Sequence, residues 1–136
     1  GCSDAHAVDA QAASEVGANL VLANLAGTSF IHNLGFLSSG RTGSLEMLVL
    51  CDELAGWASR FAHGIEVTEE TIGVEVVKRA AKDNTYLTDD HTTERYLTES
   101  WFPPMFERSD AMMWRDDGAV TMQDKIKARL AEILDI

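Results

Sequence analysis

The stretch TSFIHNLGFLSSGRTGSLEMLVLCDEL, residues 28–54, joins a short β-branched and aromatic run to a long apolar pattern with helical spacing. Residues 28–32 favour a strand, because β-branched and aromatic side chains are common in strands. Ser44 suits the position before a helix, which the apolar spacing predicts over residues 44–63 with Gly64 just beyond its end. The stretch therefore predicts a strand, a connection and a helix.

The connection between strand and helix is longer than the usual loop of about 4–6 residues. It starts at His32 and Asn33 and contains Gly35, Gly40 and Gly43. Loops that carry polar and flexible residues between regular elements are common places for function. We interpret this loop as the rim of a binding site. From residue type and position alone, His32 is either a contact for a ligand or a histidine buried beside a helix end.

Helical patterns dominate the rest of the chain, so it is predicted to be mainly α as an isolated chain. A lone strand makes no sheet, and its neighbours must come from a partner chain or from the missing part of a longer protein. The third helix is given a buried face by Ile72, Val76, Val77 and Ala80. The other expected helices run from a cap at Ser3 or Asp4 to Ala26, from Thr68, from Asp89 or Asp90 to near Trp101, after Ser109 and after Thr121.

Composition restricts the class of protein. The 136 residues suit one domain, and Lys plus Arg (11) against Asp plus Glu (22) give a net charge of −11. That balance argues against nucleic acid and against an anionic membrane surface. No apolar run is long enough for a membrane span, and no signal peptide is predicted. Because the chain opens with Gly1, we expect a processed or cloned fragment. Cys2 and Cys51 form no disulfide framework, which favours the cytoplasm.

Chemical motifs are few. Cys2, Asp4 and His6 are close in sequence, but no zinc-binding or nucleophile motif occurs, and GRTG resembles a phosphate loop only loosely. Glu46 is a partner for the helix dipole or a contact for a cationic ligand. His91 lies beside two aspartates, which favour its charged form, or is simply solvated. Three aromatic residues near the double proline form a wall for a quaternary ammonium or a packed corner: Trp101, Phe102 and Phe106.

Several motifs together resemble one known family. In chain order they are GCSDA and DAQA, then FIHNLGFLSSGRTGSLEMLVLCDE, then GIEVTEET, and finally LTDDHTTERY followed by WFPP. This order resembles the C-terminal part of the trimethylamine:corrinoid methyltransferase family. The resemblance covers residues 1–110, and its central block is long and specific. The last helix matches only as a generic helix.

The resemblance implies a cytoplasmic enzyme built as a (β/α)8 barrel. Members move a methyl group from a methylated or quaternary amine, of trimethylamine or betaine type, to the cobalt of a corrinoid (cobalamin) carried by a cognate partner protein. Residues 1–116 would then be the last barrel units with their extension, and residues 117–136 a C-terminal helix. No resident metal is implied, a homo-oligomer is expected, and any pyrrolysine would lie upstream. The isolated piece is expected to be inactive.

The same resemblance assigns residues that face the substrate or the corrinoid. Three positions depart from the family pattern, with Asn33 in place of aspartate, Met47 in place of glutamine and Cys51 in place of aspartate. The expected site residues are His32, Asn33, Gly35, Gly40, Gly43, Glu46 and His91.

A second hypothesis belongs to another class of protein. The first helix is apolar on nearly all sides in its later part, ANLVLANLA, and such a helix is expected to be covered on both sides. A free-standing α-helical interaction module, dimeric through this helix and without catalysis, is the alternative. If the chain is instead the fragment that the resemblance implies, we expect the exposed faces that normally pack on the barrel to drive self-association.

Overall fold

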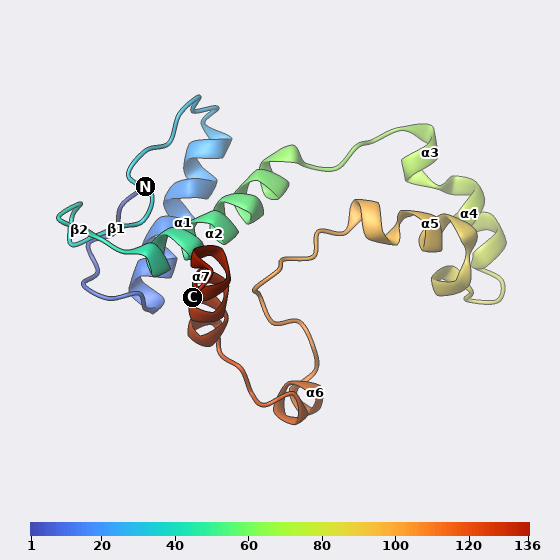
Figure 1. Ribbon diagram of the computed structural model, residues 1–136. Helices are drawn as coiled ribbons and strands as arrows, with labels where there is room; N and C mark the ends of the chain where they lie inside the picture. Colours follow the sequence, from blue (N-terminus) through green and yellow to red (C-terminus); the bar gives the residue numbers. More distant parts are fainter. The chain divides into compact units, whose positions relative to one another are not determined.

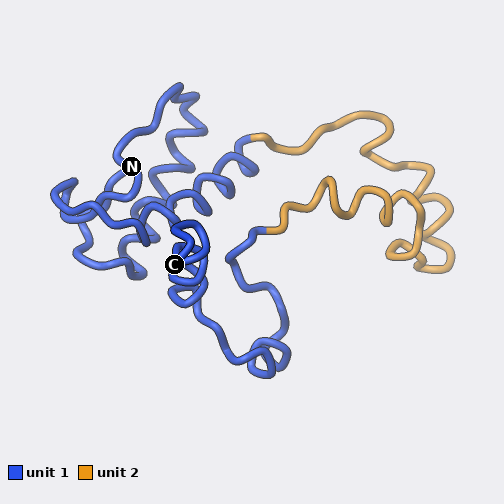
Figure 2. The backbone as a smooth tube through the Cα atoms, in the orientation of Figure 1, with its two compact units in different colours: residues 1–62, 103–136 blue, residues 63–102 orange.

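The computed structural model describes all 136 residues and divides them into two compact units (Figure 2). Unit 1 comprises Gly1–Ala62 and Pro103–Ile136, and unit 2 comprises His63–Phe102. The chain is mainly helical, as predicted, with one two-stranded sheet. None of the helices is long and apolar enough to cross a membrane.

Unit 1 is built on three helices, α1 (Ala10–Leu25), α2 (Leu45–His63) and α7 (Met122–Leu134), with the short α6 (Ala111–Asp116) between α2 and α7 in chain order (Figure 1). One apolar cluster joins the three helices, and its fully buried side chains include Val16, Leu20, Met47, Cys51 and Ile126. Burying such side chains is the main stabilising contribution, about 1.5–3 kcal/mol for each large one.

Helix α1 begins later than the sequence predicts. Its cap is Asp9, whose side chain accepts hydrogen bonds from the amides of Gln11 and Ala12, and not Ser3 or Asp4. The expectation was wrong because Ser3 and Asp4 are engaged elsewhere. The Ser3 amide donates to the carbonyl of Phe36, 33 positions further along the chain, at 3.0 Å.

The predicted strand at residues 28–32 is wrong as well. The strands are β1 (Phe36–Leu37) and β2 (Thr42–Gly43), which pair antiparallel in a hairpin. The β-branched and aromatic composition of residues 28–32 was a misleading signal, because a strand also needs a neighbour to bond. No strand of this chain pairs with residues 28–32, and Phe30 is exposed.

Unit 2 consists of α3 (Glu69–Ile72), α4 (Val74–Ala80), the 3-10 turn η1 (Tyr86–Thr88) and α5 (Asp90–Glu99). The Thr68 cap is confirmed, but Gly73 adopts a φ of +64° and breaks the predicted third helix in two. The predicted buried face is also wrong in part. Only Ala80 is buried, while Ile72 and Val77 are exposed, because unit 2 packs few apolar neighbours against α3 and α4.

Three further predicted caps are confirmed. The Ser44 hydroxyl accepts from the amide of Met47 at the start of α2, the Asp89 carboxylate from His91 at the start of α5, and Thr121 forms a capping box at α7. The division at residue 116 stays a prediction, because it concerns the parent barrel rather than the compact units of this chain.

Candidate functional site

The loop singled out in the sequence folds into a hairpin with a left-handed tip. Phe36 pairs with Gly43 and Leu37 with Thr42. The next three residues all have positive φ: +53° at Ser38, +55° at Ser39 and +83° at Gly40. Successive positive φ values are uncommon for residues with a Cβ, and they persist only where surrounding contacts hold them.

The main-chain amides of this tip are all used within the fold. Ser38 donates to the carbonyl of Ala5, Ser39 donates to that of Ser3, and Gly40 and Arg41 both donate to that of Leu37. A phosphate cradle needs free amides that point at the ligand. The loose resemblance of GRTG to a phosphate loop is therefore not supported by the geometry.

The N-terminal segment runs along the hairpin and holds the tip through side chains as well. The Ser39 hydroxyl donates to the Asp4 carboxylate at 2.7 Å, and Nδ1 of His6 lies 2.9 Å from Oγ of Ser38. Two of the three residues considered for a metal site, Asp4 and His6, thus contact the tip serines instead. The structure has no group of three or more His, Cys, Asp or Glu side chains placed to hold a metal ion.

Glu15, on α1, binds the N-terminal segment that holds the tip. Its Oε2 accepts from the Ser3 hydroxyl at 2.7 Å and from the Asp4 amide at 2.8 Å, while its Oε1 accepts from Gln11 at 2.8 Å. These bonds, the Ser3 hydroxyl foremost, lower the pKa of the Glu15 carboxyl. Sequence analysis missed Ser3 and Glu15, because no local pattern reveals a bond across 12 positions.

His32 and Asn33 lie on the exposed edge just before the hairpin. The His32 ring stacks on Phe30, with ring centroids 6.2 Å apart, and is not buried beside a helix end. Asn33 adopts a φ of +62°, a conformation in which asparagine is enriched. Gly1 lies close to the backbone of His32. A Cβ added to Gly1 would lie 2.4 Å from the His32 carbonyl oxygen.

The three loop glycines differ in their surroundings. Gly35 has a φ of +80° and packs on α2, where an added Cβ would lie 3.0 Å from Cβ of Leu48, and its amide donates to Sγ of the buried Cys51. Gly40 and Gly43 have nothing within 4 Å of an added Cβ. The positive φ of Gly35 therefore serves packing, while Gly40 and Gly43 leave open space at the tip.

The remaining predicted residues lie in two places. Glu46 is half-buried in the first turn of α2, next to the hairpin in sequence. His91 belongs to unit 2, where its Nε2 lies 3.3 Å from the carbonyl oxygen of Glu70. The expected aromatic wall is divided, since Phe102 contacts Tyr96 in unit 2 and Phe106 contacts Trp57 in unit 1.

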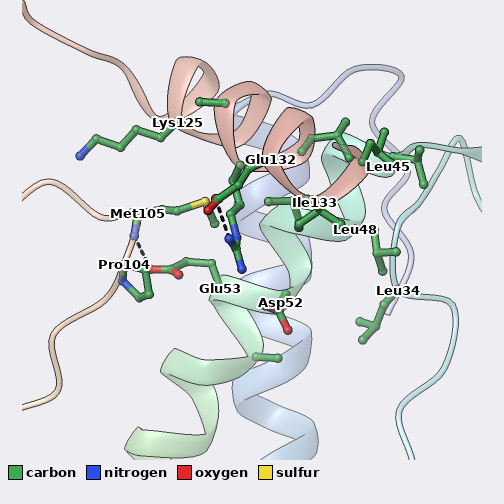
Figure 3. Close-up of a pocket in the computed structure, with 16 residues that line it drawn as sticks. Leu34, Leu45, Leu48, Asp52, Glu53, Pro104, Met105, Lys125, Glu132 and Ile133 are labelled. Atoms are coloured by element: carbon green, nitrogen blue, oxygen red, sulfur yellow. Dashed lines mark hydrogen bonds and ion pairs between the residues drawn. The ribbon is translucent and has the colours of Figure 1, made fainter. Parts of the chain in front are cut away.

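A groove of about 1020 Å³ lies between α2 and α7 in unit 1. Figure 3 shows α7 above α2, with Leu34, Leu45 and Leu48 at one end of the groove and Pro104 and Met105 at the other. Its walls are mostly apolar. The leucine and isoleucine side chains that line it are half-buried or exposed: Leu34, Leu45, Leu48, Leu130, Ile133 and Leu134.

The charges in the groove are unevenly paired. Lys125 binds Glu107 at 2.8 Å and Arg129 binds Glu132 at 2.6 Å. Glu53 is buried, and its Oε1 accepts from the Met105 amide at 3.2 Å. This bond ties residues 103–106 to α2, a role of Glu53 that the sequence did not reveal because the partner lies 52 positions away.

Comparison with known proteins places the whole chain in one family. The family model described as trimethylamine methyltransferase (MTTB) matches residues 1–136. The chain belongs to the trimethylamine methyltransferase family. The match lies in the C-terminal portion of the family's curated members, which confirms the resemblance seen in the motifs.

Three curated methyltransferases show how similar this chain is to its relatives and how much of each relative it covers. The chain is 30% identical over 135 residues to a glycine betaine methyltransferase of Desulfitobacterium hafniense (strain Y51), covering 98% of this chain and 28% of the relative. It is 29% identical to trimethylamine methyltransferase MttB of D. hafniense (strain DSM 10664 / DCB-2), covering 99% and 27%. It is 31% identical to MttB of Methanosarcina thermophila, covering 98% and 27%. The chain thus spans little more than a quarter of the length of these relatives.

Proposed function

We propose that this chain is the C-terminal part of a methyltransferase that moves a methyl group from a methylated or quaternary amine to the cobalt of a corrinoid carried by a partner protein. The observation that carries the proposal is the match of the family model to all of residues 1–136. Relatives named for trimethylamine and for glycine betaine give the substrate class, a small amine with methyl groups on nitrogen. The parent would be a (β/α)8 barrel in the cytoplasm.

The geometry of the hairpin region supports a contact with a partner-held acceptor. Phe30, His32 and the tip residues Ser39 and Gly40, here called the contact edge, are exposed, so a second protein can reach them. Active sites of such barrels are built from the loops after the strands. In this proposal His32 and Asn33 face the corrinoid or the substrate, and the Glu46 carboxylate attracts the cationic amine.

The chemistry asks mainly for alignment. The bond between nitrogen and a methyl carbon breaks, the electron pair of that bond stays on nitrogen, and cobalt(I) supplies the pair for the new bond. The protein's contribution is to hold donor and acceptor in line, which is worth up to about 7–11 kcal/mol in favourable cases. Since that alignment requires the rest of the barrel, the 136-residue chain alone is expected to transfer no methyl groups.

The test is methyl transfer by the longer enzyme that contains this sequence, mixed with its corrinoid protein and with trimethylamine or glycine betaine. Formation of methylcobalt is followed by its absorbance. We expect transfer from one of these amines and a rate at least tenfold lower for His32→Ala, which removes a side chain from the contact edge. Unchanged corrinoid binding and rate in this variant would refute the site assignment.

The matched control is His63→Ala. His63 is an exposed histidine at the end of α2, outside the proposed contact edge. We expect this variant to transfer methyl groups at the rate of the unaltered enzyme. Equal losses in both variants would indicate a general effect of losing a histidine, and no transfer from any methylated amine would refute the proposed function itself.

A further inference from the structure

We propose that Glu15 is a positioning residue that sets the conformation of the hairpin tip, residues 38–40, through the N-terminal segment. The inference rests on the proposed function in one respect, namely that the tip faces the methyl-transfer site. Glu15 does not touch the tip. It acts through Ser3 and Asp4, and the link is made of hydrogen bonds between groups far apart in sequence.

The first step is from Glu15 to the N-terminal segment. A single carboxylate oxygen, Oε2, accepts both from the Ser3 hydroxyl at 2.7 Å and from the Asp4 amide at 2.8 Å. The Ser3 hydroxyl oxygen also accepts from the Ala5 amide at 3.0 Å, and Ser3 is 1% exposed. Because bonds to a charged acceptor are stronger than neutral ones, Oε2 fixes the path of residues 3–5.

The second step is from the N-terminal segment to the tip. The carbonyls of Ser3 and Ala5 accept from the amides of Ser39 and Ser38, at 3.1 Å and 2.9 Å. The Asp4 carboxylate accepts from the Ser39 hydroxyl at 2.7 Å. Both serines have positive φ, which a residue with a Cβ adopts unfavourably. The positive φ of Ser38 and Ser39 is therefore supported by residues 3–5, which hold these acceptors in place.

The two oxygens of Glu15 provide a built-in control. Oε2 binds the N-terminal segment that holds the tip, whereas Oε1 accepts from the side-chain amide of Gln11, one turn away on the same helix. Removing the side-chain amide of Gln11 deletes one hydrogen bond to the Glu15 carboxylate. It leaves the hydrogen bonds that connect Glu15 to Ser38 and Ser39 through residues 3–5 intact. A positioning role of Glu15 thus predicts that replacing Glu15 changes the tip, whereas replacing its contact Gln11 does not.

Amide hydrogen exchange by NMR on the 136-residue chain tests the link. We expect Glu15→Ala to speed exchange at Ser38 and Ser39 at least tenfold, because bonds to a charged acceptor are lost. Exchange at Ile126, in the core on α7, should be unchanged. Gln11→Ala should leave Ser38 and Ser39 as they are. Unchanged exchange at the tip in Glu15→Ala, or equal acceleration at Ile126, would overturn the proposal.

Glu15→Gln gives a milder variant should Glu15→Ala not fold. Its amide oxygen, in the place of Oε2, can accept both bonds but carries no charge, so exchange at Ser38 and Ser39 should rise to an intermediate value. Exchange as slow as in the unaltered chain would show that the charge of Glu15 is irrelevant and would overturn the proposal.

Methyl transfer by the longer enzyme provides the functional readout. Glu15→Ala should lower kcat at least tenfold with a smaller change in KM. A misplaced tip disturbs the alignment of methyl donor and acceptor more than it disturbs binding of the amine. Gln11→Ala should keep both constants. Faster exchange at the tip with an unchanged kcat would overturn the positioning role. No transfer by the unaltered enzyme would overturn the proposed function and this role with it, and the exchange data would distinguish that outcome from failure of the Glu15 link.

Discussion

Gly35 occupies the point where the loop before the hairpin comes closest to α2. An added Cβ would lie 3.0 Å from Cβ and 3.3 Å from Cα of Leu48, and φ is +80°. We expect Gly35→Ala to lower the free energy of unfolding by about 2–4 kcal/mol, from left-handed strain and from overpacking together. Urea unfolding followed by circular dichroism measures this change.

Gly40→Ala is the matched control for that prediction. Gly40 has almost the same φ, +83°, but nothing lies within 4 Å of an added Cβ. Only the cost of placing a residue with a Cβ in the left-handed conformation, about 1–2 kcal/mol, should remain. If both alanine variants lose the same stability, the contact with Leu48 contributes nothing and our account of Gly35 is wrong.

Glu107 supplies a prediction about pH. Hydrogen bonds from Lys125, at 2.8 Å, and then from Ser109 lower the pKa of its carboxyl to about 2. A carboxyl with a lowered pKa stabilises the fold fully above its ordinary pKa, near 4.5, and this contribution is lost as the pH falls toward 2. The difference in Tm between the unaltered chain and Glu107→Gln should therefore be constant above pH 4.5 and shrink below it. A difference that is independent of pH over this range would contradict the prediction.

At the scale of elements, α7 depends on its capping box. The Thr121 hydroxyl accepts from the Asp124 amide, and the Asp124 carboxylate accepts from the Thr121 amide at 3.0 Å. Thr121→Ala removes one half of this arrangement and should lower the free energy of unfolding by about 1 kcal/mol. Thr121→Ser keeps the hydroxyl and should cost much less. Equal losses in chemical denaturation would show that the cap is unimportant.

The helices were predictable to the extent that their signals are local. Ser44, Thr68, Asp89 and Thr121 cap helices where the sequence places them, because a cap bonds to amides two or three residues away. The interruption at Gly73 was missed, although glycine is the residue that most readily adopts a positive φ.

The strands and the network around Glu15 were not predictable in this way. Residues 28–32 have the composition of a strand, but pairing depends on a neighbour that composition does not reveal. Ser3 has the chemistry of a helix cap, yet it bonds to Phe36 and Glu15 instead. The family motifs singled out this loop in the sequence, whereas its contacts required coordinates.

At the scale of the whole molecule, the groove between α2 and α7 predicts self-association of the 136-residue chain. Leu48 and Ile133 line it and are 46% and 56% exposed. Exposed apolar side chains that gather in one groove favour contact with a second chain, because that contact removes them from water. We expect sedimentation velocity to show a mass that increases with concentration, and Leu48→Asp to shift the chain toward monomer by burying a charge in the contact.

Leu22→Asp is the control and also tests the rival hypothesis. Leu22 lies on α1, is exposed and does not line the groove. A dimer formed through the first helix would be disrupted by Leu22→Asp and not by Leu48→Asp. The opposite result is expected if the groove between α2 and α7 is the associating surface, and a monomer at all concentrations would contradict both.

The use of every main-chain amide from Ser38 to Arg41 has an evolutionary consequence. The turn keeps its path without help from the side chains of Arg41 and Thr42, which are exposed. Exchanges at these two positions should then leave the backbone of the turn unchanged.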